Sequence, residues 1–270
     1  GRMVAIEEGV PVIVHVEHAH ERYKWLHLRR SRRLALQTDA IVGVSKGVVE
    51  RLRELGLPGE KLHTIYNGVR VERFVAPTPQ PWARREPAVV MASRFGQPKD
   101  QRTLIRAAAL LRDRGTPIRV RLVGGGKQLE IWRAKWLVRW LGLGGLVEFL
   151  GHRNDLPEIL WKHQVAVIST RREGFGLVAV ESMAAGCAVV ASRAPGVAEL
   201  IEHGHTGWLA TTGDPVTFAD AIAEALGAEG PVRAAAGAAF AGASFGLVRM
   251  TTEYERLFEQ LYPAKRRPSA

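Results

Sequence analysis

Residues 165–181 read VAVISTRREGFGLVAVE, and this stretch decides both the fold and the site. Its first four residues are small or β-branched and apolar, which is typical of a strand buried in a parallel sheet. A turn with Gly174 and Gly176 follows, and then a helix-forming apolar run. The stretch therefore predicts a strand, a turn and a helix. Glu173 falls on the turn, and Glu181 falls two helical turns later, on a face that meets the same crevice.

The turn offers a place for an anion, because backbone N–H groups at the start of a helix lie at the positive end of its dipole. Gly174 and Gly176 let the backbone approach a ligand with no Cβ in between. Two carboxylates can accept hydrogen bonds from neighbouring hydroxyls. A pocket that binds a phosphate by amides and hydroxyls by carboxylates has the chemistry that suits a nucleotide-sugar.

A longer pattern around this stretch resembles a known family. Residues 169–191 look like the donor-site signature of the retaining GT-B glycosyltransferases of family four. Further similarity lies in residues 93–95, Lys99, 122–126, 195–201 and 205–209. The resemblance extends from residue 10 to residue 262, which is nearly the whole chain. It implies two Rossmann-like doubly wound α/β domains and a transferase that retains the anomeric configuration.

Strand and helix patterns alternate along the chain, which favours doubly wound parallel sheets. Residues 1–76 form the predicted first domain, with three strands, and 77–246 the second, with five. The proline-rich run 76–81 reads as the linker between them. In the family, a helix such as 247–262 crosses back onto the first domain.

The first domain is expected to be incomplete. A doubly wound half has more strands, and it opens on a strand with a Gly-rich turn that this chain does not show. We therefore expect the chain by itself to bind donor but to transfer sugar poorly.

The resemblance assigns roles to the charged residues of the site. Arg94 and Lys99 follow the first strand of the second domain, and their counterparts in the family neutralise the leaving diphosphate. Glu173 matches the carboxylate that contacts hydroxyls of the donated sugar, and Glu181 matches the one that binds the ribose. His18 corresponds to a histidine that faces the donor sugar.

The backbone of the turn completes the expected donor site. Amides of Gly176, Leu177 and Val178 are expected to bind phosphate, with Gly174 and Phe175 in the same turn. Gly124, in the glycine run that follows residues 118–123, is a further donor-binding candidate.

The sequence predicts neither a metal nor a cofactor. It has no Asp-x-Asp pattern to bind a divalent ion beside a diphosphate, and its single cysteine, Cys187, rules out cysteine-based metal sites and internal disulfides. Arg94, Lys99 and the helix amides would then stabilise the leaving group electrostatically. The motif class suggests attack on the same face, with the leaving phosphate helping to deprotonate the acceptor hydroxyl.

The net charge of +11 favours anionic partners. An anionic membrane surface is a candidate, through the basic residues 29–33, and suits a glycan or lipid-linked acceptor. Trp132, Trp136 and Trp140 recur every four residues; we interpret them as a core-facing stripe in preference to a membrane face. No nucleic-acid-binding module is recognisable. One cysteine and no span-length apolar run indicate a cytoplasmic protein, peripheral on the inner face of the membrane.

Two alternatives stay open. One is another enzyme on the same fold, a sugar-nucleotide epimerase or a phosphorylase. Product analysis with a nucleotide-sugar alone distinguishes the epimerase from a transferase. A phosphorylase would need a lysine-linked cofactor, and no site for one is evident in the sequence. The other is a non-catalytic or truncated module that binds a nucleotide-sugar or docks on a membrane, as the incomplete first domain suggests.

Overall fold

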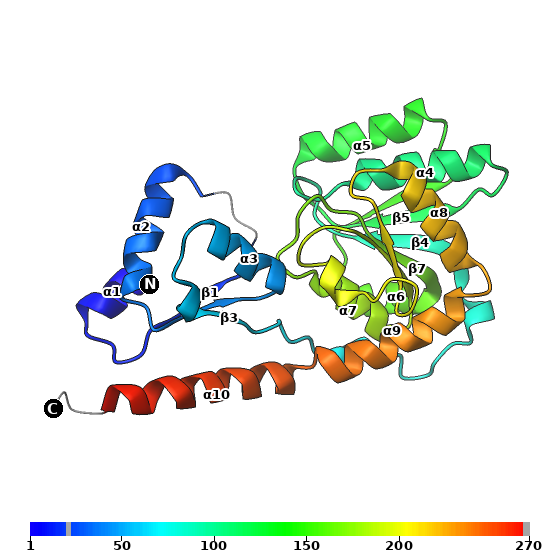
Figure 1. Ribbon diagram of the computed structural model, residues 1–270. Coiled ribbons are helices and arrows are strands. Elements are labelled where there is room, and N and C mark those ends of the chain that lie inside the picture. The colour runs from blue at the N-terminus through cyan, green and yellow to red at the C-terminus, as the bar shows by residue number, and fades with distance from the viewer. Residues whose placement is uncertain (20–22, 267–270) are drawn as a thin grey trace. The chain divides into compact units, whose positions relative to one another are not determined.

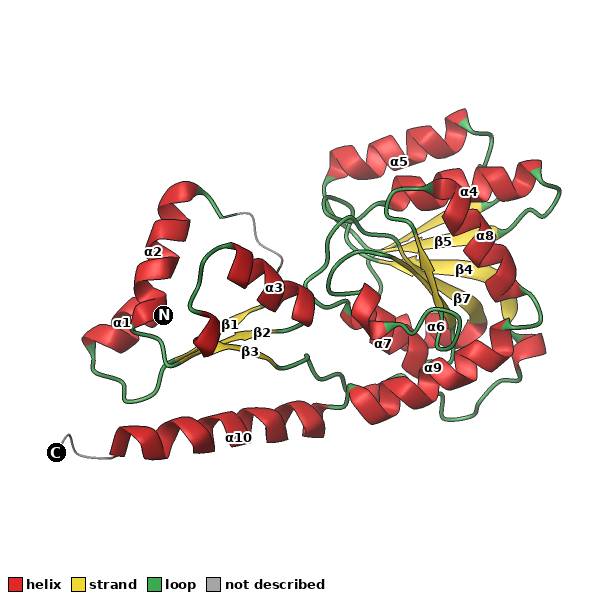
Figure 2. Cartoon of the chain, in the orientation of Figure 1, coloured by secondary structure: helices red, strands yellow, loops and turns green. Residues whose placement is uncertain are grey.

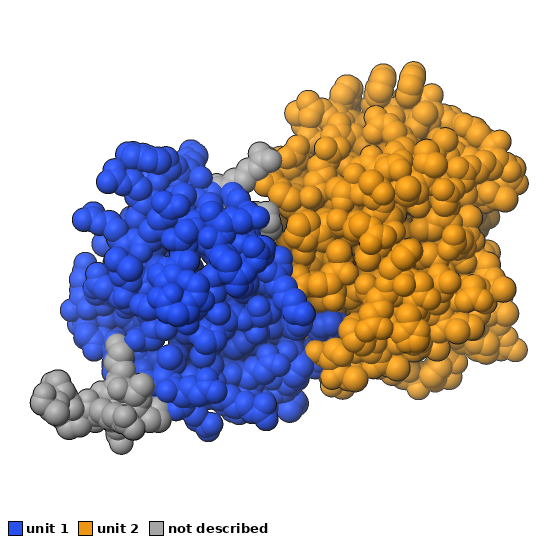
Figure 3. All heavy atoms as spheres, viewed as in Figure 1, with its two compact units in different colours: residues 1–68, 245–270 blue, residues 69–244 orange. Residues whose placement is uncertain are grey.

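The chain forms two compact units. The computed structural model describes residues 1–19 and 23–266, with side chains described as far as residue 262. Unit 1 comprises residues 1–68 and 245–270, and unit 2 comprises residues 69–244 (Figure 3). Each unit has a parallel sheet of its own, with helices packed on it (Figure 2). The mixture confirms the predicted α/β class.

Unit 1 is built on a three-stranded parallel sheet in the order β1-β2-β3. Its elements are α1 (Arg2–Glu7), β1 (Val14–Glu17), α2 (Trp25–Leu36), β2 (Ala40–Gly43), α3 (Lys46–Glu54), β3 (Leu62–Thr64) and α10 (Leu247–Arg266), with a 3₁₀ turn at Gly59–Lys61. The register pairs Ile41 with both His15 and Leu62. Ser45 caps α3, because its hydroxyl accepts a hydrogen bond from the Val48 amide at 3.1 Å.

The core of unit 1 joins segments that lie far apart in the chain. Leu257 of α10 is buried with Ala40 and Val42 of β2. At the start of α10, the Arg249 guanidinium donates to the Tyr66 carbonyl at 2.6 Å. A Cβ on Gly68 would lie 2.8 Å from the Leu247 Cα, so the backbone can approach the helix this closely only at a glycine.

Unit 2 contains a six-stranded parallel sheet in the order β6-β5-β4-β7-β8-β9. The strands are β4 (Glu86–Ala92), β5 (Arg119–Val123), β6 (Val147–Gly151), β7 (His163–Ile168), β8 (Ala188–Ser192) and β9 (Trp208–Ala210). Taken in chain order from β4, this is the doubly wound order 3-2-1-4-5-6. Five of the strands were predicted; the sixth, β9, has only three residues, too few for alternation to show.

Helices cover both faces of this sheet (Figure 1). The helices are α4 (Gln101–Asp113), α5 (Gln128–Trp140), α6 (Leu156–Lys162), α7 (Leu177–Ala184), α8 (Pro215–Leu226) and α9 (Gly230–Ser244). The first two pack together with α8 on one face, and α6, α7 and α9 lie on the other. Cys187, directly before β8, is buried, and burial raises the pKa of its thiol to about 12.

The boundary between the units falls at Gly68, earlier than the predicted boundary at residue 76. The intervening residues pack on unit 2: Phe74 is buried, and its carbonyl accepts a hydrogen bond from the Trp161 indole at 2.6 Å. The proline-rich run itself lies against α6, beside Glu158 and Lys162. It is therefore part of unit 2, and the prediction of a linker at 76–81 was wrong.

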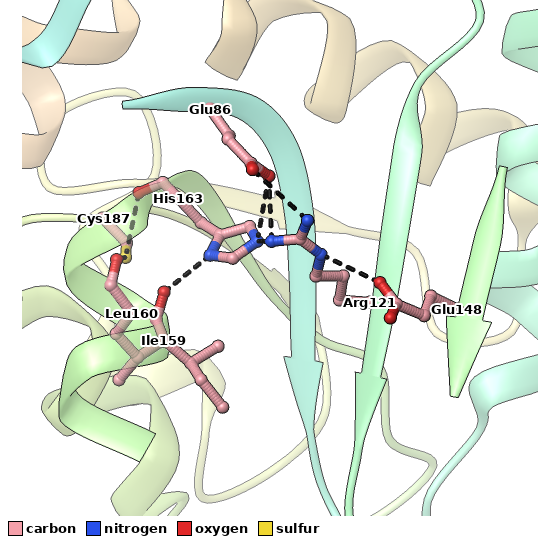
Figure 4. Close-up of polar contacts among 7 residues, drawn as sticks. All are labelled: Glu86, Arg121, Glu148, Ile159, Leu160, His163 and Cys187. Atoms are coloured by element: carbon pink, nitrogen blue, oxygen red, sulfur yellow. Dashed lines mark hydrogen bonds and ion pairs between the residues drawn. The ribbon is translucent and has the colours of Figure 1, made fainter. Parts of the chain in front are cut away.

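A charged network ties together four neighbouring strands near their amino ends (Figure 4). Arg121 on β5 lies 2.9 Å from Glu86 on β4 and 3.2 Å from Glu148 on β6. Its guanidinium also lies 2.7 Å from Nε2 of the buried His163 on β7. Because Glu86 and His163 are the first residues of their strands, this network lies at the opposite end of the sheet from the loops that follow the strands.

The tryptophan stripe of α5 is not part of the core, so that prediction was wrong. Trp132, Trp136 and Trp140 are exposed, whereas Ala134, Leu137 and Val138 form the buried face of the helix. In residues 1–19 and 23–266, no helix has both the length and the apolar character needed to cross a membrane.

Candidate active site

The site lies where the strand order reverses, between β4 and β7. In doubly wound sheets, ligands bind in the crevice outside the carboxyl ends of the strands at this point. The loops that follow the two strands are joined by backbone hydrogen bonds. The Asp100 amide donates to the Ser169 carbonyl at 3.0 Å, and the Arg171 amide donates to the Pro98 carbonyl at 2.9 Å. The two loops therefore form one surface.

Lys99 and Glu173 meet on this surface. The Lys99 ammonium forms an ion pair with the Glu173 carboxylate, and both side chains are partly exposed. The neighbouring Asp100 is buried; its carboxylate caps α4 through the Thr103 amide and also pairs with the Arg171 guanidinium at 3.0 Å. The cation and the carboxylate predicted for the donor are thus in direct contact.

The remaining predicted cation, Arg94, lies on the loop after β4 with its side chain exposed. The backbone of this loop is anchored, because the Gln101 side-chain amide donates to the Arg94 carbonyl at 2.9 Å. Among the residues that the structure describes, no group of three or more His, Cys, Asp or Glu side chains is placed to hold a metal ion.

The turn after β7 adopts a shape that requires glycine. Gly176 has φ +100° and is the N-cap of α7. Because Leu177 and Val178 begin the helix, their amides have no acceptor within it. Phe175 is buried and anchors the turn, whereas Leu177 is exposed. The predicted turn at the positive end of a helix is therefore present, and Glu173 lies beside it: the Glu173 Cγ is 3.5 Å from the position of a Cβ on Gly176.

A third loop, which follows β8, packs against the turn. Gly196 has φ +85°, and a Cβ there would lie 2.4 Å from the Glu173 carbonyl oxygen and 2.7 Å from that of Gly174. Any side chain at this position would displace the turn. The sequence placed Gly196 in a family-like segment without a role. Its signal was a glycine after Pro195, in the loop that follows β8.

Glu181 lies half-buried on α7. Burial raises the pKa of its carboxyl, and the positive charge of Arg73 opposes that rise. Arg73 was not among the predicted residues, since nothing in its local sequence distinguishes it from surface arginines. Two carboxylates from one segment thus have different surroundings: Glu173 pairs with a lysine, whereas Glu181 is partly desolvated, which disfavours its charged form, and lies near the positive charge of Arg73.

Gly124 allows two loops of the site to pack closely, but its amide is not free to bind a ligand. Its N–H donates to the Gly151 carbonyl at 2.7 Å. A Cβ on Gly124 would lie 2.2 Å from the Ser93 carbonyl oxygen, and one on Gly126 would lie 2.3 Å from that of Phe95. The glycine run thus lets the loop after β5 lie directly against the loop that carries Arg94.

His18 belongs to unit 1, where it follows β1 with an exposed side chain. The preceding Glu17 accepts a hydrogen bond from the Tyr23 hydroxyl at 2.5 Å, which orders the end of the strand beside it. The role of His18 towards the donor stays a prediction.

Comparison with known proteins identifies the family. Residues 86–228 match the family model described as "Glycosyl transferases group 1", and residues 2–73 match "Glycosyltransferase Family 4". The chain is 28% identical to the N-acetyl-alpha-D-glucosaminyl L-malate synthase of Bacillus anthracis, over 70% of this chain and 51% of that protein. It is 33% identical to the GDP-mannose-dependent alpha-(1-6)-phosphatidylinositol monomannoside mannosyltransferase of Mycolicibacterium smegmatis, over 86% of this chain and 65% of that protein.

Solved structures agree with this result. The structure of HepE of Anabaena in complex with UDP and glucose matches with a TM-score of 0.85 and 25% identity, over 96% of this chain and 74% of that one. The sucrose-phosphate synthase of Thermosynechococcus elongatus matches with a TM-score of 0.82 and 25% identity, over 93% of this chain and 68% of that one. These likenesses confirm the predicted GT-B fold class.

The chain spans between half and two thirds of the length of the two curated relatives described above. The group 1 model covers more than half of the chain and includes every element that builds the site of unit 2, from β4 to α7. The chain therefore belongs to the glycosyl transferases group 1 family.

Proposed function

We propose that this protein transfers a sugar from a nucleoside-diphosphate-sugar to a hydroxyl of a glycan or lipid-linked acceptor, with retention at the anomeric carbon and without a metal ion. The observation that carries the proposal is the contact between Lys99 and Glu173 beside the start of α7. A cation for a diphosphate, a carboxylate for sugar hydroxyls and helix amides for phosphate oxygens lie within one surface.

The Lys99–Glu173 ion pair implies an order of steps when the donor binds. The diphosphate competes with Glu173 for the Lys99 ammonium, and the Leu177 and Val178 amides donate hydrogen bonds to the phosphate oxygens. Glu173 is then free to accept hydrogen bonds from the sugar hydroxyls. Glu181, farther along α7, accepts from the ribose hydroxyls.

The proposed chemical step makes use of these positions. The bond between the anomeric carbon and the diphosphate oxygen breaks as the acceptor oxygen forms its bond on the same face of the sugar. The acceptor proton passes to an oxygen of the departing diphosphate. Lys99 and Arg94 stabilise the negative charge that develops on the leaving group, which is the part that a metal ion would otherwise supply.

The names of the relatives support the substrate class. The mycobacterial relative is described as dependent on GDP-mannose and acts on a phosphatidylinositol monomannoside, which is a lipid-linked acceptor. The matching HepE structures contain UDP and UDP-glucose. We extend a nucleotide-sugar donor and a membrane-associated acceptor to this chain, and with them a cytoplasmic place at the inner face of the membrane.

The proposal is tested by calorimetry with nucleoside diphosphates and their sugar conjugates, with and without a chelator. Binding should persist under chelation. Lys99→Ala should weaken binding by about 1.5–3 kcal/mol, since it removes a charge-assisted contact to phosphate. Lys162→Ala is the matched control, because Lys162 is exposed at the end of α6, just before the amino end of β7. Equal affinity of Lys99→Ala and wild type, or loss of binding with chelator, would contradict the proposal.

The products distinguish transfer from the alternatives. NMR of the product formed with a simple hydroxyl acceptor should show the anomeric configuration of the donor. A new nucleotide-sugar formed without acceptor would indicate an epimerase instead.

A further inference from the structure

One face of α5 exposes a continuous row of large apolar side chains. Leu129, Trp132, Trp136 and Trp140 have exposed fractions of 56%, 61%, 53% and 68%. Spacings of three and four residues place them on one side of the helix. The Trp136 and Trp140 rings stack with centroids 6.0 Å apart and planes 6° from parallel, so the row is ordered. We call these four residues the tryptophan row.

The row is unusual because the opposite side of α5 is apolar as well. Ala134, Leu137 and Val138 face the core of unit 2 and are buried. A helix on the surface of a globular unit normally presents a polar outer face. This chain has seven tryptophans, and three of them lie in this exposed row. Core packing does not account for the row, since the buried face of α5 fulfils that role.

Cations flank the row on both sides. At about 100° per residue, Arg133 projects beside one edge of the row and Arg139 beside the other. Lys127, directly before α5, and Lys135 add further exposed positive charge. Within residues 127–140 the acidic residue is Glu130, whose carboxylate pairs with Arg133 at 2.7 Å. Indole rings with arginine and lysine beside them suit the boundary between lipid headgroups and acyl chains.

We propose that the outer face of α5 docks on an anionic membrane surface, with the tryptophan row at the headgroup level and the flanking cations on lipid phosphates. The net charge of +11 adds long-range attraction to such a surface. A second copy of the chain is the less suitable occupant, because two such faces would bring like charges together. The inference concerns a surface of unit 2 outside the donor site, and it does not depend on the proposed transfer reaction.

Vesicle flotation of the full chain tests the proposal. Wild type should float with vesicles of equimolar phosphatidylcholine and phosphatidylglycerol, and much less with phosphatidylcholine alone or at high salt. The triple variant Trp132→Ser, Trp136→Ser, Trp140→Ser should bind the anionic vesicles at least about tenfold more weakly, since it loses most of the apolar area of the row. Arg133→Gln with Arg139→Gln should lose about fivefold for each cation, on anionic vesicles alone.

Trp25→Ser is the comparison variant, because Trp25 lies beside the basic residues 29–33, which the sequence also offers as a membrane contact. Trp25 on α2 has a comparable exposed fraction of 65% and lies beside basic residues, with the Arg29 guanidinium 4.9 Å from its ring centroid. It should leave vesicle binding within about twofold of wild type. Unchanged circular dichroism and melting temperature show that each variant is folded.

Three results would overturn the proposal. The first is wild type that does not float with anionic vesicles. The second is a folded triple variant that floats as wild type does. If Trp25→Ser then abolishes flotation, the membrane contact belongs to α2 and not to α5. The third is a wild-type dimer in sedimentation that the triple variant abolishes while vesicle binding is unchanged, which would assign the row to self-association.

Discussion

The two site carboxylates have different surroundings, and we expect this difference to separate their effects on binding. Glu173 is paired with Lys99, the residue that we propose binds the diphosphate. Glu181 lies deeper, on the helix, where burial raises its pKa. Neither difference could be read from the sequence, because the spacing of the two glutamates fixes their places on turn and helix but not their neighbours.

Replacing each glutamate by alanine should therefore affect different ligands. Glu181→Ala should weaken binding of the nucleoside diphosphate and of its sugar conjugate alike, by about 1–3 kcal/mol for the lost hydrogen bonds to the ribose. Glu173→Ala should reduce affinity for the conjugate while leaving the diphosphate unchanged or tighter, since Lys99 is released from its ion pair. Calorimetry with both ligands measures this; parallel losses in both variants would refute the division of roles.

The same buried glutamate should cost stability at neutral pH. Burial raises the pKa of Glu181 above its ordinary value of 4.5, so the native state holds this proton more tightly than the unfolded state. Stability therefore falls as pH rises from 4.5 through the raised pKa. Glu181→Gln should raise the melting temperature at neutral pH, and the gain should disappear below pH 4.5. A gain that persists in acid would point to packing instead of charge.

Gly196 offers a test of how tightly the turn is supported. Gly196→Ala places a methyl group 2.4 Å from the Glu173 carbonyl oxygen at φ +85°. Gly213→Ala is the control, because Gly213 has φ +80° and open space around its Cβ position. The control should lose about 1–2 kcal/mol of unfolding free energy from the backbone alone. Gly196→Ala should lose clearly more unfolding free energy, measured by denaturant titration, and should also weaken donor binding, measured by calorimetry. Equal losses of unfolding free energy in the two variants would show that the turn moves to accommodate the methyl group.

At the level of elements, His163 joins neighbouring strands at the amino end of the sheet of unit 2, and its hydrogen bonds require the neutral imidazole. Its Nδ1–H donates to the Ile159 carbonyl at 2.6 Å, and Nε2 accepts from Arg121 at 2.7 Å. Burial lowers the pKa of His163; the charges of Arg121 and Lys162 lower it further, while the Ile159 hydrogen bond and Glu86 act in the opposite direction.

Acid should therefore loosen this end of the sheet. The unfolded histidine takes up a proton near pH 6.5 and the native one resists it, so stability is complete above pH 6.5 and declines as pH falls below it. His163→Gln should reduce that decline, whereas the exposed His152→Gln should not. Calorimetric melting of the full chain across this range measures the effect; an identical acid decline in both variants would show that other groups cause it.

Elements were predictable where pattern and burial coincide. The strand predicted at residues 165–168 lies within β7 (His163–Ile168), because a short run of small and β-branched apolar residues is typical of a buried parallel strand. The orientation of α5 was not predictable, since a period of four residues shows that side chains share a face but not whether that face meets the core. Its buried side is lined by smaller residues, Ala134 and Val138 among them, which gave a weaker signal than three tryptophans.

At the scale of the whole molecule, the sequence best predicted which loops meet at the proposed donor surface. Glu173, Gly176 and Lys99 lie in loops that follow strands, and doubly wound topology brings such loops to one edge. The network around Arg121 was not foreseen, because it joins residues from four strands whose order only the fold reveals. Nor was the division at Gly68, because prolines suggest a linker even where the segment packs on a helix.

The place of α10 in unit 1 has a consequence for biosynthesis. The ribosome makes β1 to β3 before unit 2, and it makes the helix whose Leu257 packs on Ala40 and Val42 only after unit 2. At cellular rates of translation, the first sheet waits on the order of ten seconds with an apolar face uncovered. Unit 2 meanwhile has its full strand series and can fold as it emerges. The nascent chain should therefore complete its later unit first, and the waiting sheet is the segment that a ribosome-associated chaperone would hold.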